Sequence, residues 1–452
     1  MNALVLSAVL AATPITLEQV RQESRNNLQA LLSELDRVRA SEQKRVSTGA
    51  LLPQLALNAQ AARTIQQEYQ DIGPVVVLDA AGNPVRDAQG NLEYRQSLTN
   101  YPHYAVNRFQ LGATLNQVLF DLAKFQVLAQ SGHLEGAARG TAAEQMLASE
   151  FEAVRRFYVL WTAQKQLVVL QVTAQRSQEF ADRAQALFEA GRGTKGDALA
   201  AAVNLGTDRI NVEKQMAIVS QAQIDLAAWL GRPEGEELDA ADPSLPETPP
   251  PPSVTLQQGL ELARVNRPVL VQWGEQVKAA KSFETSQAAG WAPRVNFQLQ
   301  WLRSGPEADT VYTDFGKQSA VTGAITLNWD LFNGFQTDAQ TKQARAQLAQ
   351  AKLNLAQNER DVEGQVKVAL DSLGAQLRAL VVAQQNRVTA TQNLDYAQER
   401  FKAGASSTLE VRDAQLKLVQ AYQTLIQTRS DAEVARAGLE KAMGTLGNGA
   451  TP

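Results

Sequence analysis

Two hydrophobic periods alternate along this chain, and both occur twice in the same order. Apolar residues recur every three or four positions through residues 124–191 and 334–404, which predicts two very long helices. Ahead of each long stretch, apolar and polar residues alternate in two short segments, which predicts a pair of strands. We interpret the chain as a duplication, with a first repeat over residues 14–232 and a second over residues 254–446.

Each repeat is predicted to contain a helix, a β-hairpin and a long helical hairpin. The β-hairpins are expected over residues 53–120 and 293–332, and the helical hairpins over residues 123–230 and 334–446. A proline-rich linker, residues 233–253, joins the repeats, and residues 447–452 form a tail. Capping boxes led by Thr16 and Thr255 open the repeats. Each first helix is expected to run through an Asn/Arg-rich stretch to a break marked by Pro53 or Pro293.

The strand pattern is clearest in the second repeat. Its apolar positions are Val295, Phe297, Leu299, Trp301, Val321, Ile325 and Leu327, and polar residues separate them. An apolar outer face and a polar inner face are typical of membrane β-barrels, and a half-buried strand of a soluble sheet has the same period. In the first repeat, residues 71–107 are polar with two glycine-containing turn signals, which predicts a further small hairpin.

Two turn motifs of identical spacing separate the arms of the helical hairpins. The residues Phe188, Gly191, Thr194 and Asp197 recur as Phe401, Gly404, Ser407 and Glu410. In each motif the glycine ends one helix, and the hydroxyl residue caps the next. Residues 407–410 have the sequence of a full capping box.

Composition narrows the class of protein. The chain is 44% hydrophobic but only 6% aromatic, which favours long helices packed through small residues over a compact aromatic core. A net charge of -4 gives no reason to expect nucleic-acid binding, and the absence of cysteine excludes disulfides and cysteine metal sites. His103 and His133 lack the spacing of paired metal ligands, and no catalytic or nucleotide-binding motif is present. We therefore expect no metal, no cofactor and no enzymatic activity.

The sequence also indicates which segments would be involved in export and in membrane crossing. Residues 1–13 are apolar and end in small residues, as in a secretory signal peptide or an ordinary N-terminal apolar helix. No apolar run reaches about 18 residues, so any membrane crossing must use strands. Four strands cannot close a barrel, and an open edge in lipid is costly, whereas three copies would supply 12 strands. The aromatic residues Trp291, Trp301, Trp329 and Phe332 fit either an aromatic girdle or ordinary packing.

These features together resemble the TolC family of outer-membrane efflux proteins, the outer membrane factors. The resemblance is carried by the duplicated element order, by the two turn motifs, and by the strand ends Leu-Phe-Asp121 and Leu-Phe-Asn333. It covers nearly the whole chain, from about residue 16 to residue 446. Each motif is weak by itself, and their order, found twice, is specific.

The resemblance implies a mainly α fold with membrane β-structure, assembled as a homotrimer. Three protomers would form a 12-stranded β-barrel in the outer membrane, with four strands each, continued by a long α-helical coiled-coil barrel in the periplasm. The family's channels conduct solutes delivered by an inner-membrane pump through a periplasmic adaptor, the membrane fusion protein. The outer-membrane component of type I protein secretion uses the same fold. A periplasmic coiled-coil scaffold is the alternative from another class, and extraction without detergent would distinguish it.

The resemblance also assigns site residues. Asp197, Glu410, Asp413 and Phe401 match positions that line the family's periplasmic aperture. A ring of unscreened carboxylates there would favour cations, whereas Asp197 and Glu410 also occupy N3, where a carboxylate serves as a helix cap. Phe401 lacks a hydroxyl, and Ser406 stands where the family usually has a basic residue, so the family's closing contact lacks its usual partners. Arg192 and Arg412 are nearby cations and candidates to replace the usual basic residue, but the sequence does not place them.

The remaining tip residues are small or polar and match the family's contact with the adaptor, or else serve only as turn residues. They are Phe188, Gly191, Gly193, Thr194, Gly404, Ser406 and Ser407. The pore walls are predicted to be rich in Gln, Asn and Thr, so the sequence does not identify the exported solute.

Overall fold

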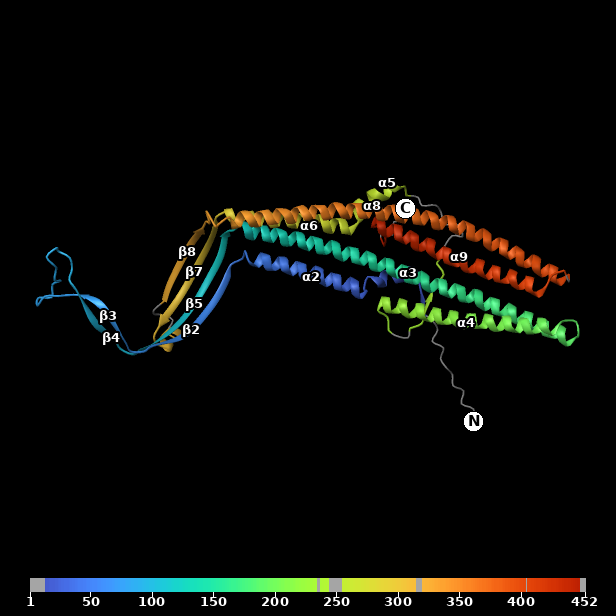
Figure 1. Ribbon diagram of the computed structural model, residues 1–452, viewed down its shortest axis with the longest axis horizontal. Coiled ribbons are helices and arrows are strands. Elements are labelled where there is room, and N and C mark those ends of the chain that lie inside the picture. Colours follow the sequence, from blue (N-terminus) through green and yellow to red (C-terminus); the bar gives the residue numbers. More distant parts are fainter. Residues whose placement is uncertain (1–12, 234–235, 244–253, 314–318, 404, 448–452) are drawn as a thin grey trace, which may run out of the picture. The chain divides into compact units, whose positions relative to one another are not determined.

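The computed structural model describes residues 13–233, 236–243, 254–313, 319–403 and 405–447, and its elements are shown in Figure 1. The chain divides into two compact units. The helical unit contains residues 1–44, 129–284 and 342–452, and the sheet unit contains residues 45–128 and 285–341. All but the last residue of the predicted signal peptide, most of the linker, Gly404 and the end of the tail lie outside the described residues.

Helices make up most of the chain, as predicted. Their bounds are α1 Leu17–Ser24, α2 Leu28–Gly49, α3 Leu122–Glu189, α4 Lys195–Leu230, α5 Leu256–Asn266, α6 Pro268–Ala288, α7 Ala308–Tyr312, α8 Gln336–Lys402 and α9 Thr408–Met443. Helices α3 and α8 have 68 and 67 residues, so each is roughly 100 Å long at 1.5 Å per residue. Figure 1 shows α4 beside α3 and α9 beside α8, as antiparallel hairpins.

The first helix of each predicted repeat is broken in two, and the expectation of one helix was wrong. Both capping boxes are present, with the side chains of Gln19 and Gln258 bonded back to the cap residues. Helix α1 ends before Asn27, whose side chain accepts a bond from the N–H of Gln29 (2.9 Å) and so caps a new helix, α2. Helix α5 ends before Pro268, which has no N–H to donate and therefore starts α6.

The main core of the helical unit lies where the middle of α3 meets α4 and the end of α9. Phe157, Tyr158 and Trp161 are its aromatic residues, and two short parallel strands, β1 (Thr13–Ile15) and β6 (Leu238–Ala240), close one side. Elsewhere small residues let helices approach closely. A Cβ added at Gly140 of α3 would lie 2.8 Å from the backbone nitrogen of Gln272 in α6, so only glycine fits there.

The sheet unit contains four antiparallel strands in the order β2-β5-β7-β8. Their bounds are β2 Gln54–Gln66, β5 Tyr104–Phe120, β7 Arg294–Gly305 and β8 Ser319–Asn328. Each covers a segment in which the sequence alternates. Within the described part of the chain, β2 and β8 pair on one side only, so they are the edges of this sheet.

The small hairpin predicted within residues 71–107 is present, and it begins two residues before that segment, at Tyr69. Strands β3 (Tyr69–Val76) and β4 (Tyr94–Tyr101) pair along their whole length. Between these two strands the chain forms two turns of similar sequence, which begin at Asp79 and Asp87. The carboxylate of each aspartate accepts hydrogen bonds from backbone N–H groups of its turn. Gly82 and Gly90 adopt φ of 84° and 89°, which these turns require.

No described helix combines the length and the apolar character needed to cross a membrane.

Candidate functional site

The four-stranded sheet has two chemically different faces. Its strand register places apolar residues mainly opposite apolar residues and polar residues mainly opposite polar residues on neighbouring strands. Leu57 lies opposite Ala113, Leu115 opposite Leu299, and Phe297 opposite Ile325. We call this side the apolar face; its residues include Leu55, Leu57, Leu111, Leu115, Val295, Phe297, Leu299, Trp301, Val321, Ile325 and Leu327. Leu55 is 76% exposed and Ile325 is 71% exposed, so this apolar surface is bare in the single chain.

The opposite side, the polar face, is lined by amides and hydroxyls. Gln54, Asn116 and Gln298 lie side by side across three strands. Further amide and hydroxyl side chains on this face include Asn58, Gln60, Gln110, Thr114, Asn296, Gln300, Thr322 and Thr326. Such groups both donate and accept hydrogen bonds, so this face suits water and polar solutes.

A hollow of about 330 Å³ lies at one end of the polar face. Its polar lining comes from all four strands and from the first turn of α3; the residues are Gln54, Asn116, Asn296, Gln298, Asn328 and Lys124. Lys124 supplies the one charged side chain among the residues that line the hollow.

At the other end, the short helix α7 covers the apolar face. Arg303 on this face is completely buried, and its guanidinium donates to the carbonyl of Thr310 in α7. The ring of Tyr312 meets Phe109 edge-on, with centroids 6.1 Å apart, and its hydroxyl donates to the carbonyl of Gln60 (2.9 Å). The bare part of the apolar face on β7 therefore ends at Trp301.

The first helical tip joins α3 to α4. Gly191 adopts φ of 71°, and the N–H of Arg192 donates to the carbonyl of Leu187, which closes the end of α3. Thr194 caps α4, and its hydroxyl donates to Asp197 (2.6 Å). This bond in particular, with a second from Thr408, holds the pKa of Asp197 below its ordinary value, so the carboxylate is ionised at neutral pH. Phe188 is partly exposed.

The second tip joins α8 to α9 and differs from its prediction. Ser407 accepts the N–H of Glu410, but the carboxylate of Glu410 does not complete the capping box. It forms an ion pair with Arg400 (2.8 Å) instead, because that guanidinium also reaches the carbonyl of Ala405 and spans the turn. Arg400 thus supplies a basic partner at this tip, where Ser406 supplies none.

The predicted aperture carboxylates have partners within the protomer, and their place at an aperture stays a prediction. Asp413 pairs with Lys417 (2.7 Å), one helical turn away. Phe401 packs against the apolar cluster around Leu394 and Val411, and lies 5.9 Å from the ring of Phe180.

A buried polar network joins the two helical hairpins near their tips. Arg412 of α9 forms two bonds to Asp208 of α4, at 2.7 and 2.8 Å, and Ser177 of α3 donates to the same carboxylate. Burial raises the pKa of Asp208, but the bonds from Arg412 and Ser177 outweigh burial and hold the pKa below its ordinary value. Sequence analysis named Arg412 without finding this partner. A signal was available, because Ala201, Asp208, Gln215 and Ala222 follow a seven-residue spacing and are all buried.

Known proteins match this chain in sequence and in fold. Residues 259–445 match the family model described as outer membrane efflux protein. The outer membrane efflux protein BepC of Brucella suis is 25% identical over 351 residues, which are 74% of this chain and 72% of BepC. The chain therefore resembles the outer membrane efflux proteins, and the family model matches its second half. The protein is an outer-membrane exit duct that extends into the periplasm, as its sequence predicted.

Solved structures show the same fold. The CmeC outer membrane channel of Campylobacter jejuni aligns with a TM-score of 0.76 and 15% identity, over 95% of this chain and 85% of CmeC. The open state of the MtrE outer membrane channel of Neisseria gonorrhoeae aligns with a TM-score of 0.75 and 16% identity, over 95% of this chain and 89% of MtrE. At these identities the likeness concerns the fold alone.

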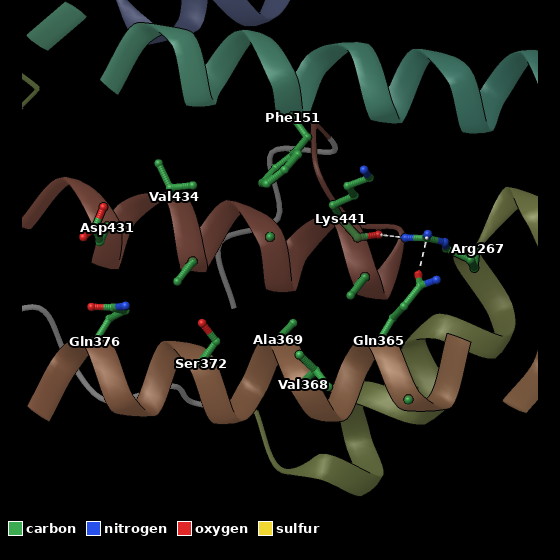
Figure 2. Close-up of a pocket in the computed structure, with 14 residues that line it drawn as sticks. Phe151, Arg267, Gln365, Val368, Ala369, Ser372, Gln376, Asp431, Val434 and Lys441 are labelled. Carbon is green, nitrogen blue, oxygen red and sulfur yellow. Dashed lines mark hydrogen bonds between the residues drawn. The ribbon is translucent and has the colours of Figure 1, made fainter. Parts of the chain in front are cut away.

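A groove in the helical unit lies between α8 and α9, with Phe151 of α3 at one side (Figure 2). Its volume is about 840 Å³, and small or apolar residues form most of its walls. Arg267 at one end is buried and donates to the carbonyl of Lys441 and to the side chain of Gln365 (3.0 Å). The ammonium of Lys441 lies 4.8 Å from the centre of the Phe151 ring. Sequence analysis identified none of these residues.

Proposed function

We propose that this protein is the passive exit duct of a tripartite efflux system and works as a homotrimer. Three copies would close a 12-stranded barrel in the outer membrane, and their helical hairpins would form a tube through the periplasm. The observation that supports this most is the two-faced sheet with two unpaired edges.

The edges argue for closure by other copies. Strand β2 has 13 residues and β8 has 10, so each presents a row of backbone groups with no partner in the described chain. In lipid each unsatisfied group costs several kcal/mol, and closing the barrel removes the edges. Pairing β8 of one copy with β2 of the next would do this, and three copies give a strand number that membrane barrels use.

The apolar face argues for lipid outside that barrel. It bears the predicted membrane-facing residues from Val295 to Trp301 and from Val321 to Leu327. Aromatic residues lie at both ends of the strands, as in the girdles of membrane barrels. They are Trp291, Trp329 and Phe332 at one end, and Tyr69, Tyr101 and Tyr104 at the other.

The helical hairpins carry exposed apolar seams that suit neighbouring copies. On α4, Val203, Ile210 and Ile224 follow a seven-residue spacing and are more than half exposed. On α8, Val368, Val382 and Tyr396 lie in steps of 14 and are also exposed. Seams of this spacing pack against another helix in a coiled coil, so they support a helical tube built from several protomers.

The tips are proposed to have two roles. Phe188, Gly191, Gly193 and Thr194 of the first tip, with Gly404, Ser406 and Ser407 of the second, would contact the tips of the periplasmic adaptor, and an inner-membrane pump would supply the energy. Asp197, Glu410, Asp413 and Phe401 would surround the aperture. The ion pair between Arg400 and Glu410 spans the turn and would hold the second tip in its closed shape.

Single-channel conductance of detergent-purified protein in planar bilayers tests this proposal. The unaltered protein should purify as a trimer and show a small conductance. Glu410→Gln/Asp413→Asn should increase it or change its ion selectivity, because the closing contacts and two charges per protomer are lost. Asp431→Asn, a neutralised carboxylate further along α9, serves as the matched control and should change neither. Protein that stays soluble without detergent and conducts nothing would contradict the channel and leave the coiled-coil scaffold.

A further inference from the structure

The strands of the sheet have an unusual charge composition. Strands β2, β5, β7 and β8 together hold 52 residues, with four arginines and neither aspartate nor glutamate. The whole chain has a net charge of -4, so a sheet of +4 leaves -8 for the rest. The excess positive charge is therefore confined to the part of the chain that is proposed to form the barrel.

The strand register assigns each arginine to a face. Arg63 and Arg303 belong to the apolar face, and Arg303 is buried beneath α7. Arg108 lies opposite Ala62, and Arg294 lies opposite Asn328, so both belong to the polar face. Arg294 is paired with Asp330 at 2.6 Å, and Arg108 is exposed.

Lys124 adds a second exposed cation on the polar side, at the opposite end from Arg108. It lines the hollow with the amides of Gln54, Asn116 and Gln298. Arg108 lies eight residues along β5 from Asn116, which lines the hollow, and this spacing is about 26 Å at 3.3 Å per residue. Between these two cations the polar face carries amides, hydroxyls and small residues, and the described strands place no carboxylate there.

We propose that the polar face is an anion-favouring section of the duct, with Arg108 and Lys124 as the residues that determine its selectivity. This inference rests on the proposed trimeric channel. A 12-stranded barrel has a backbone radius of roughly 12 Å, from a strand spacing of about 4.8 Å and a tilt of about 40°. The Debye length is about 8 Å at physiological ionic strength, so rings of three cations on the wall act across most of the lumen. Small organic anions are the solutes that such a section accommodates best, because guanidinium, ammonium and amide groups all donate to their oxygens.

The reversal potential of single channels in a KCl gradient tests the inference. Arg108→Gln and Lys124→Gln should each lower the chloride-to-potassium permeability ratio about twofold, because each removes three charges from the lumen. Arg108→Lys keeps the charge and should keep the ratio of the unaltered protein. Arg63→Gln is the matched control, since Arg63 lies next to the partner of Arg108 in the ladder but on the opposite face.

The outcomes separate this inference from the channel itself. A conducting protein whose permeability ratio is unchanged in both Arg108→Gln and Lys124→Gln would overturn the inference and leave the channel intact. An equal shift in Arg63→Gln would also overturn it, because the effect would not depend on the face. No conductance from the unaltered protein would overturn the proposed channel, and this inference with it.

Discussion

The four-stranded sheet and the helical tips differ in the sign and in the pairing of their charged side chains. The charged residues on the four strands of the sheet are all arginines, and each lies within the first or last five residues of its strand. The tips carry both signs close together, and the three predicted aperture carboxylates all have bonding partners within ten residues of their own position or on the other hairpin. In the proposed duct, exposed cations on the polar face act on passing solutes, whereas the paired charges in the tips hold helices in place.

The strongest test of this contrast removes the buried charge between the hairpins. Asp208→Leu leaves the guanidinium of Arg412 buried without its partner, and we expect a loss of about 3–5 kcal/mol in the free energy of unfolding. Urea unfolding followed by circular dichroism measures it. The double variant Asp208→Leu/Arg412→Met should recover much of the loss, because no unpaired charge remains. Equal losses in the single and double variants would show that packing, and not charge, accounts for the effect.

Acidification weakens the same network more gently. The folded-state pKa of Asp208 is below its ordinary value, so its contribution to stability is complete above the unfolded pKa of about 3.9 and is lost as pH falls through the lowered pKa. The stability difference between the unaltered protein and Asp208→Asn should stay constant from about pH 7 to about pH 4 and shrink only below that. A difference that already shrinks near neutral pH would contradict the assigned ion pair.

The smallest effect is expected in the sheet. Arg294 and Asp330 are both about half exposed, and exposed pairs contribute about 0–1 kcal/mol. Arg294→Gln should therefore change the unfolding midpoint little, and urea unfolding beside Asp208→Leu makes the comparison direct. A loss as large as that of Asp208→Leu would remove the distinction between the two regions.

The strands of the sheet and their two faces were predictable because they depend on the alternation of neighbouring residues in the sequence. Alternation along each strand gives the two faces, and the ladder only has to keep them in phase, as it does from Leu55 to Leu327. The ends of α3 and α8 were predicted within two residues, since glycines and capping residues mark them. The covering of Arg303 by α7 was not predicted, because the sequence does not show where the loop after β7 folds.

The tips were less predictable because their partners come from other helices. Glu410 had the spacing of a capping box, yet Arg400, ten residues earlier, binds its carboxylate. The break at Asn27 involves the carbonyl of Trp229, which is 202 residues away. Such pairings depend on how helices pack, and a period along one helix does not contain that information.

The most direct test of the account is the accessibility of alternate residues along β7. The chain contains no cysteine, so single cysteines can be introduced without a background. In a conducting bilayer, a water-soluble charged thiol reagent should change the current of Gln298→Cys and Gln300→Cys, which lie on the polar face, and leave Phe297→Cys and Leu299→Cys unchanged. Equal reaction at all four positions, or reaction only at the apolar positions, would contradict the central claim that the polar face of this sheet lines the duct.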